Sequence, residues 1–323
     1  MTGRALVLGA GGFLGSHLCR GLLARGWQVT GVVRDPDALH VARRLADLPA
    51  RMRLVTGDVA DTSLLERETD GVDAVFPFAG RSGAARSVED PFPDLTGNAT
   101  PQLALLETLR RTGRRARVVF PGSRLQYGRA QQLPVDEEHP REPTSVYGVH
   151  KLLGEHYHRL YHDLHGIPTT CLRISNPYGP HQDRADAAFG VVGTFLATAA
   201  AGDDLRLFGG GHQLRDYLYV EDLVDLCIRA AVTPAAVGRV YNAGGDRATS
   251  LREMAETVVA TVGRGGLREV PWPPTEAQVE TGDYVTDISR AREELGWRPR
   301  VPLDEGLAVT WSALQPLLST DPS

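Results

Sequence analysis

Tyr147 and Lys151, spaced Tyr-x-x-x-Lys in the segment YGVHK, have the residue types and spacing for acid–base chemistry. On a helix, this spacing places both side chains on one face, one turn apart. An ammonium group beside a phenol favours the phenolate, and so lowers the phenol pKa from about 10 toward working pH. We therefore predict that Tyr147 exchanges a proton with a substrate and that Lys151 tunes it.

Of the 35 Lys and Arg residues in the chain, Lys151 is the only lysine. A lysine presents three donors on a compact head, which can hold the ribose hydroxyls of a nicotinamide nucleotide, whereas a planar guanidinium is less suited to that task. The alternative for a Tyr-x-x-x-Lys pair is a solvated pair on a helix surface. The unique use of Lys at this position favours the catalytic interpretation.

Ser123 ends the apolar run 116–123, which precedes the Tyr147 segment. The carboxyl ends of parallel strands are where ligands meet an open α/β sheet. We therefore predict that Ser123 hydrogen-bonds a substrate hydroxyl or carbonyl beside Tyr147. A serine after a strand is also common as a cap or turn residue, and that alternative stays open.

Three glycines, Gly9, Gly12 and Gly15, follow the first predicted strand in the segment VLGAGGFLG and open the first predicted helix. Glycines at such a turn allow backbone N–H groups to approach a pyrophosphate at the helix N-terminus. Position and spacing together predict dinucleotide binding.

The choice between NAD and NADP rests on the end of the second predicted strand. An Asp or Glu is expected there to bind the ribose hydroxyls, but the chain has Val33, then Arg34 and Asp35. Arg34 is suited to a 2′-phosphate and favours NADP, whereas Asp35 would reach the ribose only if the loop bends. Both cofactors stay open.

The surrounding elements alternate between strands and helices. Strands are predicted at 4–10, 28–33, 53–58, 73–80, 116–123 and 168–175, with helices at 15–26, 100–113 and 145–166. This alternation predicts an α/β fold with a doubly wound parallel sheet.

After residue 176 the pattern changes, which indicates a smaller second α/β region. Helices are predicted at 189–202, 220–232 and 287–296, a strand at 205–211, and a buried strand at 238–245 that could rejoin the main sheet. We expect a dinucleotide-binding domain of residues 1–175 plus about 238–250, and a substrate-binding domain of 176–237 plus about 251–323.

Composition argues against several other classes of protein. The net charge is -5 and the pI about 6.1, so nothing suggests a nucleic-acid or membrane partner. No run approaches the ~20 apolar residues of a membrane span, and no signal peptide is evident, so we expect a cytoplasmic protein. Cys19, Cys171 and Cys227 match neither a disulfide framework nor a metal site, and no metal is predicted.

Several further segments fall in the order of a known family. They are GD at 57–58, FAG at 78–80, GSRLQYG at 122–128, LRISNPYGP at 172–180, and the stretches 209–225 and 287–307. With the glycine-rich turn and Tyr147-x-x-x-Lys151, they resemble the extended short-chain dehydrogenases/reductases, specifically the NAD-dependent epimerase/dehydratase family. The resemblance covers nearly the whole chain. It implies a Rossmann domain, a bound nicotinamide cofactor and a nucleotide-diphosphate sugar as substrate.

The resemblance also implies contacts, residue by residue. Besides the glycines, Arg34, Tyr147 and Lys151, the implied cofactor contacts are Phe13, Leu14, Asp58, Val59, Phe78, Ala79, Gly80 and Ile174. The implied substrate contacts are Ser82, Ser123, Asn176, Arg215 and Asp283. His181 follows NPYGP, and from this position we predict that it faces the sugar pocket and could assist as an acid. Glu280 departs from the family pattern, because epimerases often have a phosphate-contacting Arg there. The family further implies a homodimer formed through the helices near 100–113 and 145–166.

The segment after Ser123 narrows the reaction. Family dehydratases and decarboxylases carry acidic residues there, whereas this chain has Arg124, Leu125 and Gln126. The reactions of the family that remain need only Tyr147, Lys151, Ser123 and the cofactor. The main hypothesis is a nucleotide-sugar 4-epimerase that works through a transient 4-keto sugar. The alternatives are an NADPH-dependent 4-ketoreductase of a nucleotide keto-deoxy sugar and, less favoured, a dinucleotide-binding protein without catalysis.

Overall fold

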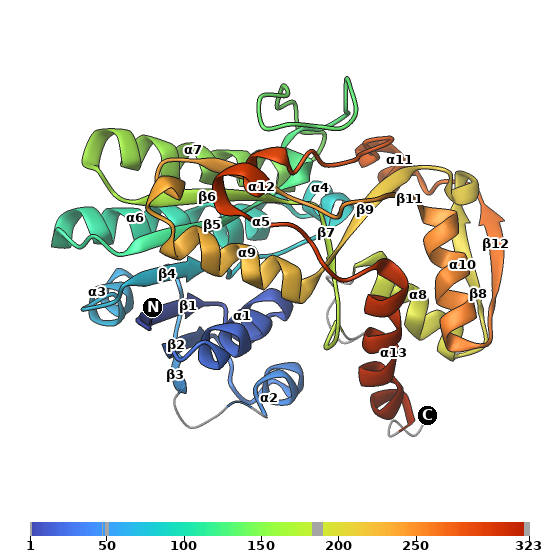
Figure 1. The fold of residues 1–323 in the computed structure, drawn as a ribbon, viewed down its shortest axis with the longest axis horizontal. Helices are drawn as coiled ribbons and strands as arrows, with labels where there is room; N and C mark the ends of the chain where they lie inside the picture. Colours follow the sequence, from blue (N-terminus) through green and yellow to red (C-terminus); the bar gives the residue numbers. More distant parts are fainter. Residues whose placement is uncertain (1, 47, 49–51, 183–189, 320–323) are drawn as a thin grey trace.

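A parallel sheet of seven strands forms the centre of the computed structural model (Figure 1), which describes residues 2–46, 48, 52–182 and 190–319. The strand order is β10-β6-β5-β4-β1-β2-β3. The bounds are Arg4–Leu8 for β1, Gln28–Val33 for β2, Met52–Thr56 for β3, Ala74–Pro77 for β4, Arg117–Ser123 for β5, Thr169–Ile174 for β6 and Val240–Ala243 for β10. The predicted doubly wound sheet is confirmed, and the strand predicted at 238–245 rejoins it beside β6.

Helices cover both faces of this sheet, because successive side chains of a strand point to opposite faces. Ala5 and Val7 of β1 belong to one core, and Leu6 and Leu8 belong to the other. The first face is covered by α1 (Phe13–Ala24), α2 (Leu39–Leu45), α9 (Val220–Val232) and α12 (Ser289–Leu295). The second is covered by α3 (Thr62–Glu68), α6 (Thr100–Thr112) and α7 (Val146–His165). The short α5 (Pro91–Asn98) packs on α6 and α7, and α4 (Ala84–Glu89) precedes it.

The start of α7 is set by a side-chain cap. The hydroxyl of Ser145 accepts a hydrogen bond from the backbone N–H of Gly148 at 3.1 Å, which satisfies one of the free N–H groups of the first turn. Tyr147 therefore stands in the first turn of α7, and Lys151 stands one turn later. The helix ends at Gly166, whose left-handed backbone (φ 62°) is the stop predicted for it.

A smaller region packs at one side of the large sheet. It holds a three-stranded sheet of β7 (Asn176–Tyr178), β9 (Leu214–Tyr219) and β11 (Ala248–Ser250), and the pair β8 (Asp204–Phe208) with β12 (Gly266–Val270). Its helices are α8 (Val191–Ala200), α10 (Leu251–Val262), α13 (Leu303–Ser319) and the short α11 (Pro274–Val279). Apolar side chains of α8, α10, α13 and β8 form a separate core.

Some helices pack in a different region from the one that their position in the chain predicts. The helices α9 and α12 lie outside the residues predicted for the dinucleotide-binding domain, yet they contribute to the core of the large sheet. In Figure 1 α9 runs beside α1, against that sheet. The elements without a counterpart in the prediction are α2, α3, α4, α5, α10, α11, α13, β7, β9, β11 and β12. Within the described residues, none of the helices is both long and apolar enough to cross a membrane.

Candidate active site

The glycine-rich turn lies where the strand order of the sheet reverses direction. Gly9 follows β1 with φ 86°, and a side-chain carbon at this position would lie 2.6 Å from the backbone nitrogen of Ala79, just after β4. Only glycine permits both this backbone conformation and this close approach. Since β1 and β4 are neighbours, the turn and the loop after β4 meet at the carboxyl edge of the sheet, where α/β folds bind ligands.

The same turn fits the pyrophosphate of a dinucleotide. A side-chain carbon at Gly15 would lie 2.1 Å from the carbonyl oxygen of Gly9, so α1 can begin tightly against β1 only with glycine there. Gly12 occupies the cap position of α1 and offers no side-chain cap, which leaves the N–H groups of the first turn, including those of Phe13 and Leu14, for another acceptor. These residues would hold the pyrophosphate.

The other predicted cofactor contacts come from neighbouring strand ends. Arg34 is exposed directly after β2, and Asp58 is exposed shortly after β3. The carboxylate of Asp35 accepts hydrogen bonds within its own loop, from the backbone of Asp37 and Ala38 at 3.0 and 3.2 Å. Val59, Phe78, Ala79, Gly80 and Ile174 also follow or end strands β3, β4 and β6 at this edge. The structure therefore brings these predicted residues to one side of the sheet.

Ser123 fills one of the two roles that the sequence left open, that of a cap residue. It ends β5 and caps a short 3-10 turn over Arg124–Gln126: its hydroxyl accepts from the N–H of Leu125 at 3.2 Å, and its own N–H donates to the side-chain oxygen of Gln126 at 2.7 Å. Ser123 also lies close enough to Tyr147 to act on its phenol, whose pKa it lowers. The cap holds the backbone of Ser123, so the position of this serine beside the phenol is fixed.

Lys151 lies beneath Tyr147 on the same face of α7. Its ammonium nitrogen is 5.7 Å from the centre of the Tyr147 ring and donates a 2.9 Å hydrogen bond to the carbonyl of Pro121. Its side chain is buried, and burial lowers the pKa of Lys151 to about 8, although the carboxylate of Asp94 acts in the opposite direction. The prediction that the two residues share one helix face is confirmed.

The predicted effect on the pKa of Tyr147 is wrong for the protein without cofactor. Burial raises the pKa of Tyr147 to about 12; Ser123 and the charge of Arg124 oppose this rise, and Asp94 adds to it. The desolvation of the phenolate outweighs the stabilising contacts, and the ammonium of Lys151 is directed to the Pro121 carbonyl. The residues form the expected arrangement, but Tyr147 is a neutral phenol.

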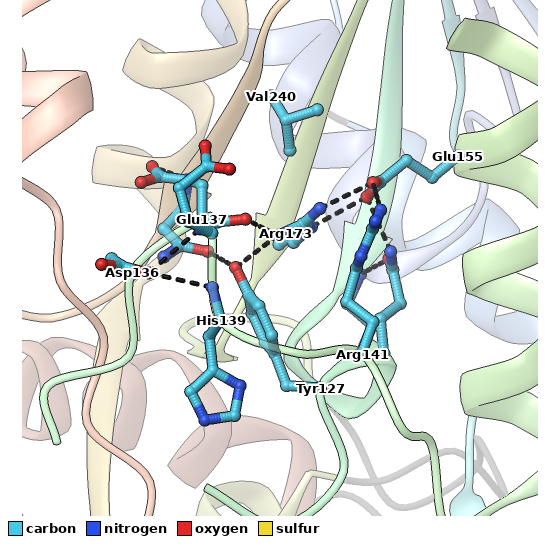
Figure 2. Close-up of polar contacts among 12 residues, drawn as sticks. Tyr127, Asp136, Glu137, His139, Arg141, Glu155, Arg173 and Val240 are labelled. Carbon is cyan, nitrogen blue, oxygen red and sulfur yellow. Dashed lines mark hydrogen bonds and ion pairs between the residues drawn. The ribbon is translucent and has the colours of Figure 1, made fainter. Parts of the chain in front are cut away.

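A buried ionic network supports this site and was not predicted (Figure 2). Arg173 of β6 makes two hydrogen bonds of 2.9 and 2.7 Å to the carboxylate of Glu155, and one of 2.7 Å to the hydroxyl of Tyr127. Glu155 also accepts from the side chain of Gln126 at 2.7 Å, and Gln126 in turn holds Ser123. The network thus joins α7 to the Ser123 turn. The signal in the sequence was Ser123 followed three residues later by Gln126, a capping-box spacing.

The predicted substrate contacts lie around β7 and β9. Asn176 donates a 2.9 Å hydrogen bond to the carbonyl of Asp216 and accepts from Arg124 at 3.2 Å. The guanidinium of Arg215 pairs with Glu280 at 2.5 Å and also donates to two backbone carbonyls. Asp283 accepts from the N–H of Leu214 at 2.8 Å. The residue that departs from the family pattern, Glu280, is therefore the counter-ion of Arg215.

Two predicted substrate contacts lie elsewhere on the site. Ser82 belongs to the loop between β4 and α4. His181 lies beside the glycine-rich turn: its carbonyl accepts from Arg44 at 3.0 Å, and Arg44 also donates to the carbonyl of Gly11 at 3.3 Å. The ring of His181 is 5.8 Å from that of His17 in α1. His181 is thus placed on the cofactor side.

The three cysteines and His158, outside this site, pack as core residues. Cys19, Cys171 and Cys227 are buried and free. His158 stacks on Phe120, with ring centres 4.7 Å apart, and hydrogen-bonds the Gln102 side chain at 3.1 Å. Among the described residues no cluster of His, Cys, Asp or Glu has the form of a metal site.

The fold and this geometry define a Rossmann-type enzyme with a short-chain dehydrogenase/reductase site. Residues 5–244 match the model of the NAD dependent epimerase/dehydratase family, and the chain belongs to that family.

Relatives in this family include both epimerases and dehydratases. The chain is 35% identical to the UDP-glucose 4-epimerase of Mycolicibacterium smegmatis, over 95% of this chain and 97% of that one. It is 29% identical to a dTDP-glucose 4,6-dehydratase of Xanthomonas campestris, over 94% and 91% of the two chains. The solved UDP-glucuronic acid 4-epimerase of Bacillus cereus, in complex with UDP-glucuronic acid and NAD, superimposes with a TM-score of 0.86 at 26% identity, over 97% and 99%.

Proposed function

We propose that this protein is a nucleotide-sugar 4-epimerase, and the observation that carries the proposal is the set of side chains around Ser123. Ser123, Tyr147 and Lys151 are together, and the turn that follows the serine holds Arg124, Leu125 and Gln126. A dehydratase needs acidic groups at that turn to remove a proton and expel water. An arginine, a leucine and an amide supply neither, so hydride transfer at a single carbon is the reaction that these residues support.

In the proposed reaction Tyr147, once its phenol has released a proton to solvent in the cofactor complex, removes as phenolate the proton of the sugar C4 hydroxyl while Ser123 holds the C4 oxygen. The nicotinamide cofactor accepts the hydride of C4 and later returns it. Between these two transfers the 4-keto sugar rotates and presents its other face to the cofactor. Tyr147 then gives the proton back to the C4 oxygen. Lys151 holds the nicotinamide ribose. Proton and hydride are both returned, so the cycle consumes no cofactor.

We assign NAD as the cofactor and a UDP-hexose as the substrate class. The support is the UDP-sugars named for the epimerase relatives and the NAD in the solved epimerase complex. Against this stands Arg34, exposed after β2 and suited to a 2′-phosphate, which favours the second candidate, an NADPH-dependent 4-ketoreductase. The assignment of NAD is tested by measuring the dissociation constants of NADH and NADPH from this protein. We expect the dissociation constant of NADH to be the lower of the two.

The deciding experiment is turnover without added cofactor. Purified protein incubated with UDP-glucose and no added nicotinamide is expected to form UDP-galactose, as followed by chromatography of the nucleotide sugars. Net consumption of NADPH with a nucleotide 4-keto sugar, and no epimerisation, would establish the reductase instead.

We further propose that the protein forms a homodimer through α6 and α7, which pack against each other on one side of the sheet (Figure 1). Apolar side chains are exposed on these helices: Leu103 on α6, and Val149, Leu160 and Leu164 on α7, with Leu164 66% exposed. A pair of helices from each of two copies would bury them together as a four-helix interface.

A further inference from the structure

Arg124 follows Ser123 directly and carries a positive charge whose partners are all neutral. Its Nε donates to the side-chain oxygen of Asn176 at 3.2 Å, and its Nη1 donates to the hydroxyl of Thr281 at 3.1 Å. The guanidinium carbon lies 5.2 Å from the centre of the Tyr284 ring. The second terminal nitrogen, Nη2, makes no hydrogen bond to a described residue, and no carboxylate of those residues forms an ion pair with Arg124.

The neighbouring arginine is in the opposite situation. Arg215 pairs with Glu280 at 2.5 Å, and its other terminal nitrogen donates to the carbonyls of Leu214 and Gly282. Its positive charge is therefore compensated inside the protein. The two arginines are close enough for the charge of Arg215 to act on Arg124, and burial, followed by that charge, lowers the pKa of Arg124 to about 10. The carboxylates of Asp216 and Glu280 act on Arg124 in the opposite direction, but from a distance. Arg124 is thus held beside the site without a direct ion pair to a described residue.

A partly buried cation without a counter-ion is costly, and the cost is removed when an anion binds to it. The turn after Ser123 faces the substrate side, because Arg124 contacts Asn176 of β7 and Thr281, which directly follows Glu280. We propose that Arg124 is the residue that binds the anionic group of the substrate, because the charge of Arg215 is already paired with Glu280. This inference rests on the proposed function for the identity of the substrate.

Two parts of a nucleotide sugar offer the same anionic chemistry. One is the diphosphate, present in every nucleotide-diphosphate sugar. The other is a carboxylate on the sugar, present in a hexuronate. A guanidinium binds either through two parallel hydrogen bonds, so the experiment must separate them.

The test compares the wild-type protein with Arg124→Gln by calorimetry, using UDP, UDP-glucose and UDP-glucuronate as separate ligands. If Arg124 binds the diphosphate, the Kd of all three ligands rises about tenfold to a hundredfold. If it binds a sugar carboxylate, only the Kd of UDP-glucuronate rises. An unchanged Kd for all three ligands would overturn the inference.

Two further variants secure the result. Arg268→Gln, at an exposed position of β12, is the matched control and is expected to bind all three ligands as the wild type does. Should Arg124→Gln fail to fold, Arg124→Lys is the deciding variant, because it keeps the charge but loses the two parallel hydrogen bonds. The Kd of at least one ligand is then expected to rise. Wild-type Kd values for all three ligands would refute the role of Arg124 in binding the anionic group. Failure of the proposed function is recognised separately, because the wild type would then bind UDP-sugars without epimerising them.

Discussion

The ammonium nitrogen of Lys151 lies 5.7 Å from the centre of the Tyr147 ring, one helical turn away, yet its hydrogen bond goes to the carbonyl of Pro121. The pair is therefore assembled in the protein without ligands, whereas the tyrosine is a neutral phenol. A nearby positive charge lowers a phenol pKa, and the oxidised nicotinamide ring carries such a charge when it is bound. Assembly of the side chains and activation of the phenol are thus separate events.

The first prediction concerns the proton carrier. Tyr147→Phe removes the phenol hydroxyl and keeps the ring, so we expect kcat for UDP-hexose epimerisation to fall about a hundredfold to ten-thousandfold. Cofactor binding, measured by calorimetry, should persist, because the glycine-rich turn is untouched. Wild-type turnover in this variant would exclude Tyr147 as the acid and base.

The second prediction concerns the pH at which Tyr147 ionises. Burial raises its pKa to about 12, so the difference in phenolate absorbance between wild type and Tyr147→Phe should stay flat up to about pH 10 without cofactor. Addition of NAD should shift the onset of that difference to lower pH. A phenolate signal near neutral pH in the cofactor-free protein would contradict the dominance of burial.

The third prediction concerns the stability supplied by the network in Figure 2. The carboxylate of Glu155 is buried and binds the equally buried Arg173. Glu155→Gln leaves a buried guanidinium without its counter-ion, so the free energy of unfolding should fall by about 3–5 kcal/mol, as measured by urea denaturation. Glu66→Gln is the matched control, because the Glu66–Arg111 pair is exposed, and its effect should be much smaller.

The fourth prediction concerns acid stability. Burial lowers the pKa of His17 from 6.5 to about 4, although its hydrogen bond with the Pro180 carbonyl acts in the opposite direction. Between pH 6.5 and 4 the unfolded chain binds a proton that the folded protein does not, so stability falls as the pH falls. In His17→Gln the free energy of unfolding should therefore decrease less than in the wild type between pH 6.5 and 4. His165→Gln, at an exposed position, is the control; equal pH dependence in wild type and His17→Gln would refute the assignment.

The fifth prediction concerns the proposed dimer. Leu164→Glu places a charge on the exposed apolar face of α7, where a second copy would bury it. Light scattering after size exclusion should show a dimer for the wild type and a monomer for the variant. Leu133→Glu, also exposed but in the loop after β5, should remain dimeric. A monomeric wild type would dismiss the interface.

The sequence by itself determined the parallel sheet, the glycine-rich turn and the Tyr147–Lys151 face, because these depend on local patterns: alternating apolar strands, glycines that a tight turn requires, and side chains four apart on a helix. It also determined which residues follow Ser123, and hence which reactions they cannot support. Only the tertiary structure decided the charges. The protonation of Tyr147 depends on burial and on the hydrogen bond that directs Lys151 to Pro121. The charge of Arg215 is paired because Glu280 lies beside it. Arg124 has no ion pair because its hydrogen-bond partners are the neutral side chains of Asn176 and Thr281. Burial and long-range electrostatic contacts arise when segments far apart in the chain pack together, and no local pattern encodes them.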